Sequence, residues 1–267
     1  MDGKKSFAEM SSQERILARL AGGGWVSGED LAGSLGVSRM AVAKQIDKLR
    51  REGHLIRSRT HKGYMLEVPM ERLSREAVVP LLRTAVLGRT EWRELESTPS
   101  TNSCAIAWAL EGGPAGAVVT AHEQTNGKGR RGHSWFSSPR GMHLSVILPP
   151  RGGAGQDARV TMAALQALQR AVAATAGVEA AIKKPNDLFL NGKKICGILV
   201  ESGQRGGETD WLVLGIGCNV NVVPDEFPEE IRSKTTSLYA ECGAAIAKNR
   251  LAAETLNHLE ELLLQDN

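Results

Sequence analysis

The sequence predicts an α+β protein of two domains: a winged helix-turn-helix, then an α/β domain with a mixed, largely antiparallel sheet. Three observations support this. The length of 267 residues exceeds that of one typical domain. The first 67 residues show short capped helices followed by a basic ribbon, and the remainder mixes β-branched runs with amphipathic stretches. We expect domains at residues 1–68 and 69–267.

Helix-capping signals dominate the beginning of the chain. Ser11 and Glu14 form a capping box ahead of a first apolar face. Ser27 starts a second helix and Gly36 ends it. Ser38 then caps a third helix at residues 39–51. Two short helices joined by a tight turn predict a helix-turn-helix, whose second helix would enter a DNA major groove.

Charge and a predicted wing favour duplex DNA as a partner of this domain. Residues 54–66 read as a two-stranded ribbon with a basic tip. Residues 38–62 hold 8 basic and 2 acidic side chains, a net charge of +6. The candidate DNA contacts are Ser38, Arg39, Met40, Lys44, Lys48 and Lys62. A purely structural three-helix module is the alternative.

The second domain is expected to contain the following elements in chain order: a helix at 74–87 bent at Pro80, strands at 117–123 and 142–148, a helix at 158–176, a hairpin turning at Asn191 and Gly192, a strand at 211–223, and a helix at 249–264 capped by Asn249.

Composition excludes several classes of protein. No apolar run approaches the ~20 residues that cross a bilayer, and residues 1–5 lack the apolar stretch of a secretory signal. We therefore expect a cytoplasmic protein without a membrane partner. The four cysteines show no CxxC spacing, which favours free thiols over a metal site.

A glycine-rich basic loop, GKGRRG at residues 127–132, matches the dinucleotide pattern GxGxxG. A dinucleotide loop must open a helix, but the following residues HSWFSSPRG do not start one. Glycines that expose backbone N–H groups between Lys128, Arg130 and Arg131 instead indicate an anion site. Trp135 could stack on a base. An exposed basic surface loop is the alternative.

Two further clusters are polar and lie at predicted element boundaries. Residues 97–102, STPSTN, precede a helix and by default form only its cap. Residues 182–187, IKKPND, precede the hairpin and by default form a turn.

In order and spacing, these clusters resemble the biotin–protein ligases. The resemblance includes KKICGILVE at residues 193–201 and GIGCNVN at residues 215–221. SRMAVAK at 38–44 and KGY at 62–64 resemble the bifunctional members that also repress biotin-synthesis genes. The similarity covers about residues 10–265.

This resemblance implies an ATP-dependent biotin–[acetyl-CoA-carboxylase] ligase. The carboxylate of biotin attacks the α-phosphate of ATP, giving biotinyl-5′-AMP and pyrophosphate. A lysine of the biotin carboxyl carrier protein then takes the biotinyl group and AMP leaves. Biotin and ATP are substrates, Mg²⁺ is held mainly by phosphates and water, and a homodimer is expected to bind the DNA operator.

The resemblance also implies the roles of individual residues. Lys194 and Arg130 are the expected catalytic residues, facing the carboxylate and the α-phosphate. The expected biotin-binding residues are Ser100, Thr101, Asn102, Gln124, Gly127, Lys128, Gly129, Arg130, Lys194, Gly197 and Gly217. The expected nucleotide-binding residues are Arg130, Arg131, Trp135, Lys183, Asn186, Asp187 and Asn219. No residue is assigned firmly to a metal.

Three features depart from the family pattern. Lys184 stands at a usual tryptophan, and His133 stands at a usual basic residue. The sequence ends soon after a helix where most members continue into a small β-barrel, so we expect no barrel. A biotin-sensing transcription factor without catalysis and a ligase for a related acyl group such as lipoate remain as alternatives.

Overall fold

The computed structural model describes residues 9–150, 155–205 and 208–265, and the chain divides into two compact units, Met1–Met70 and Glu71–Asn267. Residues 1–5, on which the expectation of no secretory signal rests, lie outside the described residues. Within the described part of the chain, no helix has both the length and the apolar character needed to span a bilayer.

Side-chain caps set the helices of the first unit, as predicted. The helices are α1 (Ser12–Leu20), α2 (Gly28–Leu35) and α3 (Arg39–Arg51). Ser11, Ser27 and Ser38 each accept a hydrogen bond from a backbone N–H of the first turn. Gly36 ends α2 with a φ of 68°, a left-handed conformation that glycine adopts without strain. The capping box at Ser11 is complete.

The predicted wing is an antiparallel pair of strands, β1 (Leu55–Arg59) and β2 (Gly63–Val68). The apolar faces of the three helices meet in one core with β1. The buried members of this core are Ile16, Leu20, Leu31, Ala32, Val42, Ile46, Leu49 and Ile56. The third helix is thereby held by one face, and its basic face stays exposed.

The second unit is built on a seven-stranded sheet in the order β3-β4-β5-β9-β8-β7-β6. Its strands are β3 (Trp92–Thr98), β4 (Val118–Gln124), β5 (Met142–Leu148), β6 (Ala181–Lys183), β7 (Asp187–Leu190), β8 (Lys193–Arg205) and β9 (Glu208–Cys218). β3 and β4 are parallel and every other neighbouring pair is antiparallel. The prediction of a mixed, largely antiparallel sheet is therefore confirmed.

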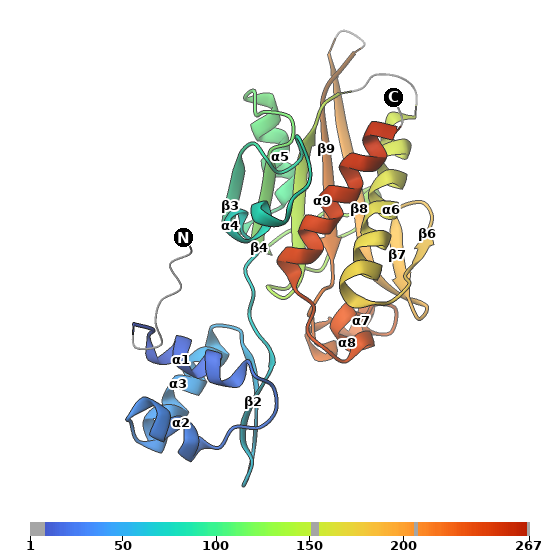
Figure 1. The fold of residues 1–267 in the computed structure, drawn as a ribbon. Coiled ribbons are helices and arrows are strands. Elements are labelled where there is room, and N and C mark those ends of the chain that lie inside the picture. The colour runs from blue at the N-terminus through green and yellow to red at the C-terminus, as the bar shows by residue number, and fades with distance from the viewer. Residues whose placement is uncertain (1–8, 151–154, 206–207, 266–267) are drawn as a thin grey trace. The chain divides into compact units, whose positions relative to one another are not determined.

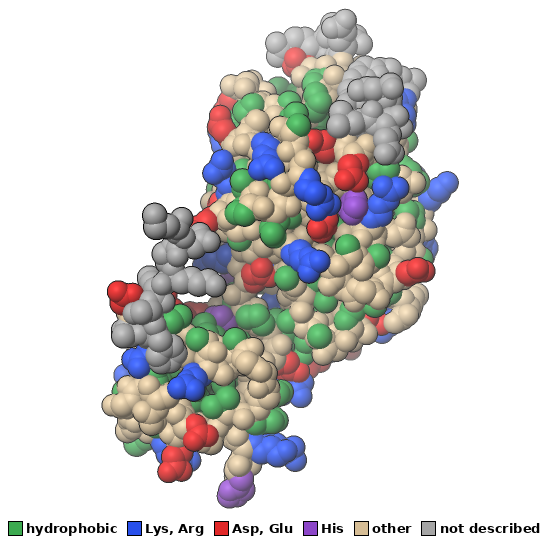
Figure 2. Space-filling view, viewed as in Figure 1, with side chains coloured by type: hydrophobic (Ala, Val, Ile, Leu, Met, Phe, Trp, Pro, Cys, Tyr) green, Lys and Arg blue, Asp and Glu red, His purple; other side chains and the backbone are tan. Residues whose placement is uncertain are grey.

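Helices cover both faces of this sheet (Figure 1). α6 (Gln156–Ala176) and α9 (Lys248–Gln265) lie side by side on one face and bury the larger core against β5, β8 and β9. α5 (Thr101–Leu110) packs on the other face over a smaller core. On the surface shown in Figure 2, acidic and basic side chains are interspersed over this unit. The face shown there therefore carries no large patch of a single charge sign.

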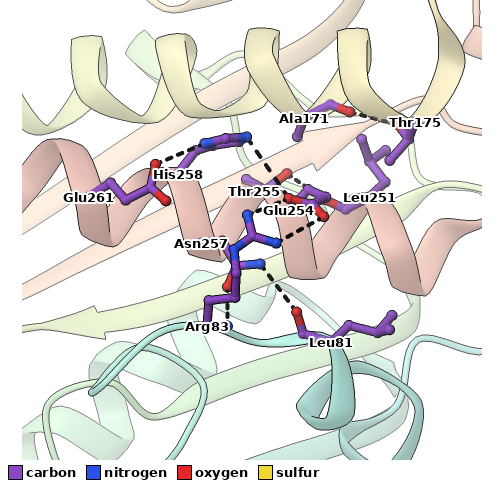
Figure 3. Close-up of polar contacts among 10 residues, drawn as sticks. All are labelled: Leu81, Arg83, Ala171, Thr175, Leu251, Glu254, Thr255, Asn257, His258 and Glu261. Atoms are coloured by element: carbon purple, nitrogen blue, oxygen red, sulfur yellow. Dashed lines mark hydrogen bonds and ion pairs between the residues drawn. The ribbon is translucent and has the colours of Figure 1, made fainter.

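The predicted helix at residues 74–87 is wrong beyond its first turns. α4 (Arg75–Val78) passes into a 3-10 turn, η1 (Val79–Leu81), and the chain then becomes extended at Leu82. α9 stabilises this irregular segment. Figure 3 shows Arg83 paired with Glu254 and the Asn257 amide bound to the Leu81 carbonyl. The buried Glu260 carboxylate accepts three consecutive backbone N–H groups, those of residues 85–87.

Two other predicted boundaries also need correction. β9 ends at Cys218 and not at residue 223, because Asn221 instead bonds the backbone of Arg140 and Ile246. Asn249 lies inside α9 and does not cap it. Its side-chain amide donates to Glu71 and to the Arg72 carbonyl. These bonds join segments far apart in the sequence, so local patterns could not reveal them. Short turns η3 (Pro224–Glu226), α7 (Glu229–Arg232) and α8 (Leu238–Cys242) fill the connection.

Candidate active site

A pocket of about 200 Å³ opens between the start of α5, the glycine-rich loop, β8 and β9. It collects most of the residues that the sequence analysis singled out. Those that line it are Ser100, Thr101, Asn102, Gln124, Lys128, Gly129, Arg130, Trp135, Asn186, Asp187, Lys194, Gly197 and Gly217. Segments spread over more than a hundred positions therefore converge on one cavity.

The N-terminus of α5 forms the polar, uncharged side of the pocket. Ser100 is the N-cap residue, is 2% exposed, and makes no side-chain cap hydrogen bond. Gln124 takes over the capping role, because its Oε1 atom accepts from the Thr101 backbone N–H at 2.9 Å. The Gln124 amide is thereby oriented, with its oxygen on the helix and its NH₂ group available for a ligand.

Asn102 lies in the first turn of α5 and is almost completely buried, at 3% exposed. Its Nδ2 atom donates to Glu201 Oε2 at 2.8 Å and to the Leu199 carbonyl at 3.2 Å. Its Oδ1 atom accepts from Ser145 Oγ at 2.6 Å. Neither Ser145 nor Glu201 is among the predicted site residues, since neither belongs to one of the polar clusters in the sequence.

Glycines of β8 and β9 leave the space that the polar side chains occupy. A Cβ atom on Gly215 would lie 2.1 Å from Asn102 Oδ1, which no real contact allows. A Cβ on Gly217 would lie 2.5 Å from the Trp135 ring, and one on Gly197 3.1 Å from it. The Trp135 ring therefore packs directly on the backbone of both strands and lines this pocket beside the candidate biotin-binding residues.

Positive charge gathers at the other end of the pocket. Lys194 Nζ lies 2.6 Å from Asp187 Oδ1 and 5.5 Å from the centre of the Trp135 ring. Arg130 lies on the glycine-rich loop, where a 3-10 turn, η2 (Arg130–Gly132), changes the chain direction. A polar, uncharged end and a cationic end together suit a ligand with a hydrogen-bonding head and an anionic tail.

Not every predicted site residue reaches the cavity. Arg131 has a φ of 56° and is exposed, and Lys183 lies 4.4 Å from the centre of the Phe189 ring. Asn219 is buried, and its side chain donates to the Thr236 carbonyl. Gly127 packs against the Trp135 backbone. These four residues do not line the pocket, and their contacts with ligand stay predictions.

Comparison with known proteins decides the family. Residues 94–219 match the model of the biotin/lipoate A/B protein ligase family, and residues 12–65 match an HTH domain. The bifunctional ligase/repressor BirA of Bacillus spizizenii is 35% identical over 245 residues, which cover 91% of this chain and 73% of that protein. BirA of Escherichia coli is 30% identical, over 93% of this chain and 75% of that protein.

The chain belongs to the biotin protein ligase family. Among solved structures, the ligase from Aquifex aeolicus in complex with biotin and ATP has a TM-score of 0.58 and 27% identity, covering 66% of this chain and 71% of that one. The ligase from Leishmania major in complex with biotinyl-5-AMP has a TM-score of 0.53 and 26% identity, covering 66% and 75%.

In this biotin protein ligase, a second hollow of about 640 Å³ lies beside the pocket. Arg130 lines both cavities. Lys184, which replaces the usual tryptophan, lines the second hollow together with Pro185, Asp157 and Ser202. Lys184 is exposed and does not line the smaller pocket. Its ammonium group therefore adds positive charge to the second hollow, which Arg130 also lines.

The helix-turn-helix unit of this ligase carries a groove of about 800 Å³ between α2, α3 and the wing. Arg39 and Met40 line it, and the Met40 side chain is 85% exposed. Lys44 and Lys62 are exposed. The other two candidate contacts already have partners within the unit. Ser38 caps α3, and Lys48 Nζ donates to Gln13 at 3.0 Å.

The residues present also suit a magnesium ion that is held mainly by its nucleotide. No group of three or more His, Cys, Asp or Glu side chains that could hold a metal occurs among the described residues. The pocket nevertheless contains one carboxylate, Asp187, next to Asn186. Asn186 Nδ2 donates to the Ile198 carbonyl, which leaves its oxygen unengaged by that bond. Oxygen ligands in this small number are typical of nucleotide-bound Mg²⁺.

Proposed function

We propose that this chain adenylates biotin in the pocket between α5, the glycine-rich loop and strands β8 and β9, and then transfers biotin to a lysine of a biotin carboxyl carrier protein. The observation that carries the proposal is that one cavity is lined both by the polar, uncharged side chains of Thr101 and Asn102 and by the cations Lys194 and Arg130. The ureido ring of biotin matches the first pair of side chains, and its carboxylate matches the second.

In the first step, a biotin carboxylate oxygen forms a bond to the α-phosphorus of ATP, and the bond from that phosphorus to the bridging oxygen breaks. Pyrophosphate leaves and biotinyl-5′-AMP remains. Two anions must approach each other, so a fixed cation lowers the barrier most where their charges meet. Lys194 supplies this cation by moving its ammonium from Asp187 to the reacting anions. Mg²⁺ would neutralise the leaving phosphates, with Asp187 and Asn186 as its protein ligands.

In the second step, the ε-amine of the carrier lysine attacks the acyl carbon of the mixed anhydride, an amide bond forms, and AMP leaves with the electron pair of the broken C–O bond. The chain must hold the adenylate until the carrier arrives. The glycine-rich loop closes one side of the cavity with Lys128, Gly129 and Arg130. Excluding water there protects the anhydride from hydrolysis.

Substitution of Lys194 by glutamine tests the proposal. Lys194→Gln should reduce pyrophosphate release by about 100-fold or more, since it removes a charge that acts in the transition state. Lys193→Gln is the matched control, because Lys193 is the exposed neighbour on β8 and does not line the pocket. Near-normal pyrophosphate release by folded Lys194→Gln protein would contradict the assignment. A wild-type protein that binds biotin without releasing pyrophosphate would instead support a biotin sensor without catalysis.

The helix-turn-helix unit supports a second role. We propose that a homodimer binds two DNA half-sites through α3 and the wing, and represses biotin-synthesis genes. The exposed Arg39, Met40, Lys44 and Lys62 support this role. Footprinting of operator DNA with and without biotin and ATP tests it. We also propose a cytoplasmic location, where ATP, carrier protein and DNA occur together.

A further inference from the structure

The Glu201 carboxylate is linked to the pocket through a single amide. It is half-buried on β8 and accepts from Asn102 Nδ2 at 2.8 Å. No ion pair joins Glu201 to a Lys, Arg or His side chain of the described residues. Among the described residues, its side-chain partner is therefore the Asn102 amide.

The partners of Asn102 determine which way its amide faces. The Glu201 carboxylate and the Leu199 carbonyl can only accept hydrogen bonds. The NH₂ group of Asn102 must therefore face them, and both of its hydrogens are used. The only hydrogen-bonding capacity that the amide retains for a ligand is on its oxygen.

Ser145 continues this arrangement on strand β5, which is separated from β8 by β9. Its hydroxyl lies 2.6 Å from Asn102 Oδ1 and 2.8 Å from Thr101 Oγ1, but it has one hydrogen. Because Asn102 Oδ1 can only accept, the Ser145 hydrogen goes to Asn102. The Thr101 hydroxyl must then donate to Ser145 or to Gln124. The Glu201 carboxylate and the Leu199 carbonyl together thereby fix the direction of a buried chain of hydrogen bonds.

We propose that Glu201 is a positioning residue that holds the Asn102 oxygen toward the pocket, and that it selects acids whose head group carries N–H donors. This inference rests on the proposed function, because it deepens the specificity of the same pocket. The ureido ring of biotin carries two N–H donors. The dithiolane ring of lipoate carries none and gains nothing from an oriented acceptor.

Gly215 supports the same assignment from the opposite strand. With a Cβ atom 2.1 Å from Asn102 Oδ1, any other residue would displace the amide. The amide is therefore held by bonds on one side and by close packing on the other. Such constraint preorganises the acceptor before a ligand arrives.

The test is the isosteric substitution Glu201→Gln. A glutamine removes the charged acceptor of Asn102 Nδ2, so that only the Leu199 carbonyl still holds the NH₂ group firmly and the Asn102 oxygen is less well fixed toward the pocket. The Kd for biotin, measured by calorimetry, should rise about 10- to 100-fold, the range for a buried hydrogen-bonding group that is left unsatisfied. The rate of pyrophosphate release at saturating biotin should stay within about twofold, since the reacting atoms lie at the other end. Glu123→Gln, an exposed change on β4, is the matched control.

A panel of acids separates positioning from general damage. Desthiobiotin keeps the ureido group and should lose affinity in parallel with biotin. Octanoate lacks N–H donors, and its inhibition constant against biotin should not change. Equal losses for all three acids, or an unchanged Kd for biotin, would overturn the proposal. If Glu201→Gln fails to fold, Ser145→Ala tests the chain from its other end, with the same loss expected for biotin and none for octanoate. Failure of the proposed function would appear differently, as absent pyrophosphate release by the wild type with biotin and ATP.

Discussion

Lys194 and Asp187 form an ion pair across strands β8 and β7, with Nζ and Oδ1 2.6 Å apart. Both side chains line the candidate active site. Asp187 therefore neutralises the ammonium before substrates bind. In the proposed reaction, the carboxylate of biotin and the α-phosphate would compete for Lys194, and Asp187 would be released to bind a cation.

Asp187→Asn should separate these two roles. Without its partner, Lys194 is no longer held by a competing carboxylate, so the Kd for biotin should not rise. Pyrophosphate release should fall by about 10- to 100-fold, and more Mg²⁺ should be needed for half-maximal rate, because a cation ligand is lost. The measurement is a Mg²⁺ titration of initial rates, with Asp225→Asn on the exposed turn η3 as control. An unchanged Mg²⁺ dependence would exclude Asp187 as a ligand.

Arg130→Gly should let the adenylate escape. Arg130 lines both cavities, and its loss should weaken the grip on biotinyl-5′-AMP so that free intermediate labels bystander lysines. The adjacent Arg131→Gly is a close control, because Arg131 lies outside the pocket and its φ of 56° suits glycine. Mass spectrometry of biotin on an added unrelated protein measures the escape. Labelling confined to the carrier in the Arg130 variant would show that the loop does not retain the intermediate.

Lys184→Trp should affect the nucleotide more than biotin. Lys184 lies in the larger hollow beside Arg130, away from the polar end of the smaller pocket. Replacing its charge with a ring should change the KM for ATP by about 3- to 10-fold, with the KM for biotin altered less than twofold. Steady-state rates with each substrate varied in turn measure this. Equal effects on both constants, or none, would mean that the position is only structural.

Lys44→Ala should weaken DNA binding at low salt. An exposed lysine on α3 that contacts phosphate releases about one counterion, so the slope of log K against log salt should fall by about one. Arg19→Ala, at the end of α1, removes a cation from another helix and is the control. Fluorescence anisotropy with an operator duplex at several salt concentrations measures both slopes. Identical slopes for the wild type and Lys44→Ala would place the DNA elsewhere.

The stability of the catalytic unit should fall in mild acid because of His143. Complete burial lowers the pKa of His143 to about 4, from a usual value of 6.5. Between pH 6.5 and pH 4, the His143 side chain binds a proton in the unfolded chain but not in the folded chain. Unfolding therefore becomes easier as the pH falls from 6.5 to 4. The loss reaches about 3 kcal/mol. Urea unfolding at pH 7.5 and 4.5 measures it, and His143→Gln should show a smaller loss. Equal losses would assign the acid sensitivity to other groups.

The local rules of capping and periodicity were sufficient for the first unit. Ser27, Ser38 and Gly36 act within four residues of the helix ends that they fix, so the sequence alone places those ends. The same holds for the hairpin turn at Asn191 and Gly192, whose φ values of 48° and 78° match the predicted turn. Signals of this kind need no knowledge of distant segments.

Long-range partners account for the errors. Asn249 looks like a cap but binds Glu71, 178 residues away. The segment after Pro80 looks helical, but the Glu260 carboxylate holds its backbone N–H groups. In the pocket, motif resemblance brought together most lining residues. Ser145 and Glu201 escaped, because an alternating strand gives no sign of which polar side chain meets Asn102.

The bare backbone at Gly215 and Gly217 has a consequence for how such pockets can diversify. The Asn102 side chain occupies the place that a methyl group on Gly215 would take. The Trp135 ring occupies the place that a methyl group on Gly217 would take. On the side that β9 forms, the depth of the cavity is therefore fixed by the backbone. Neither glycine has a side chain that a substitution could shorten. Variants that accept bulkier acids must instead be sought in the loop at residues 127–135, where side chains and turn length can still vary.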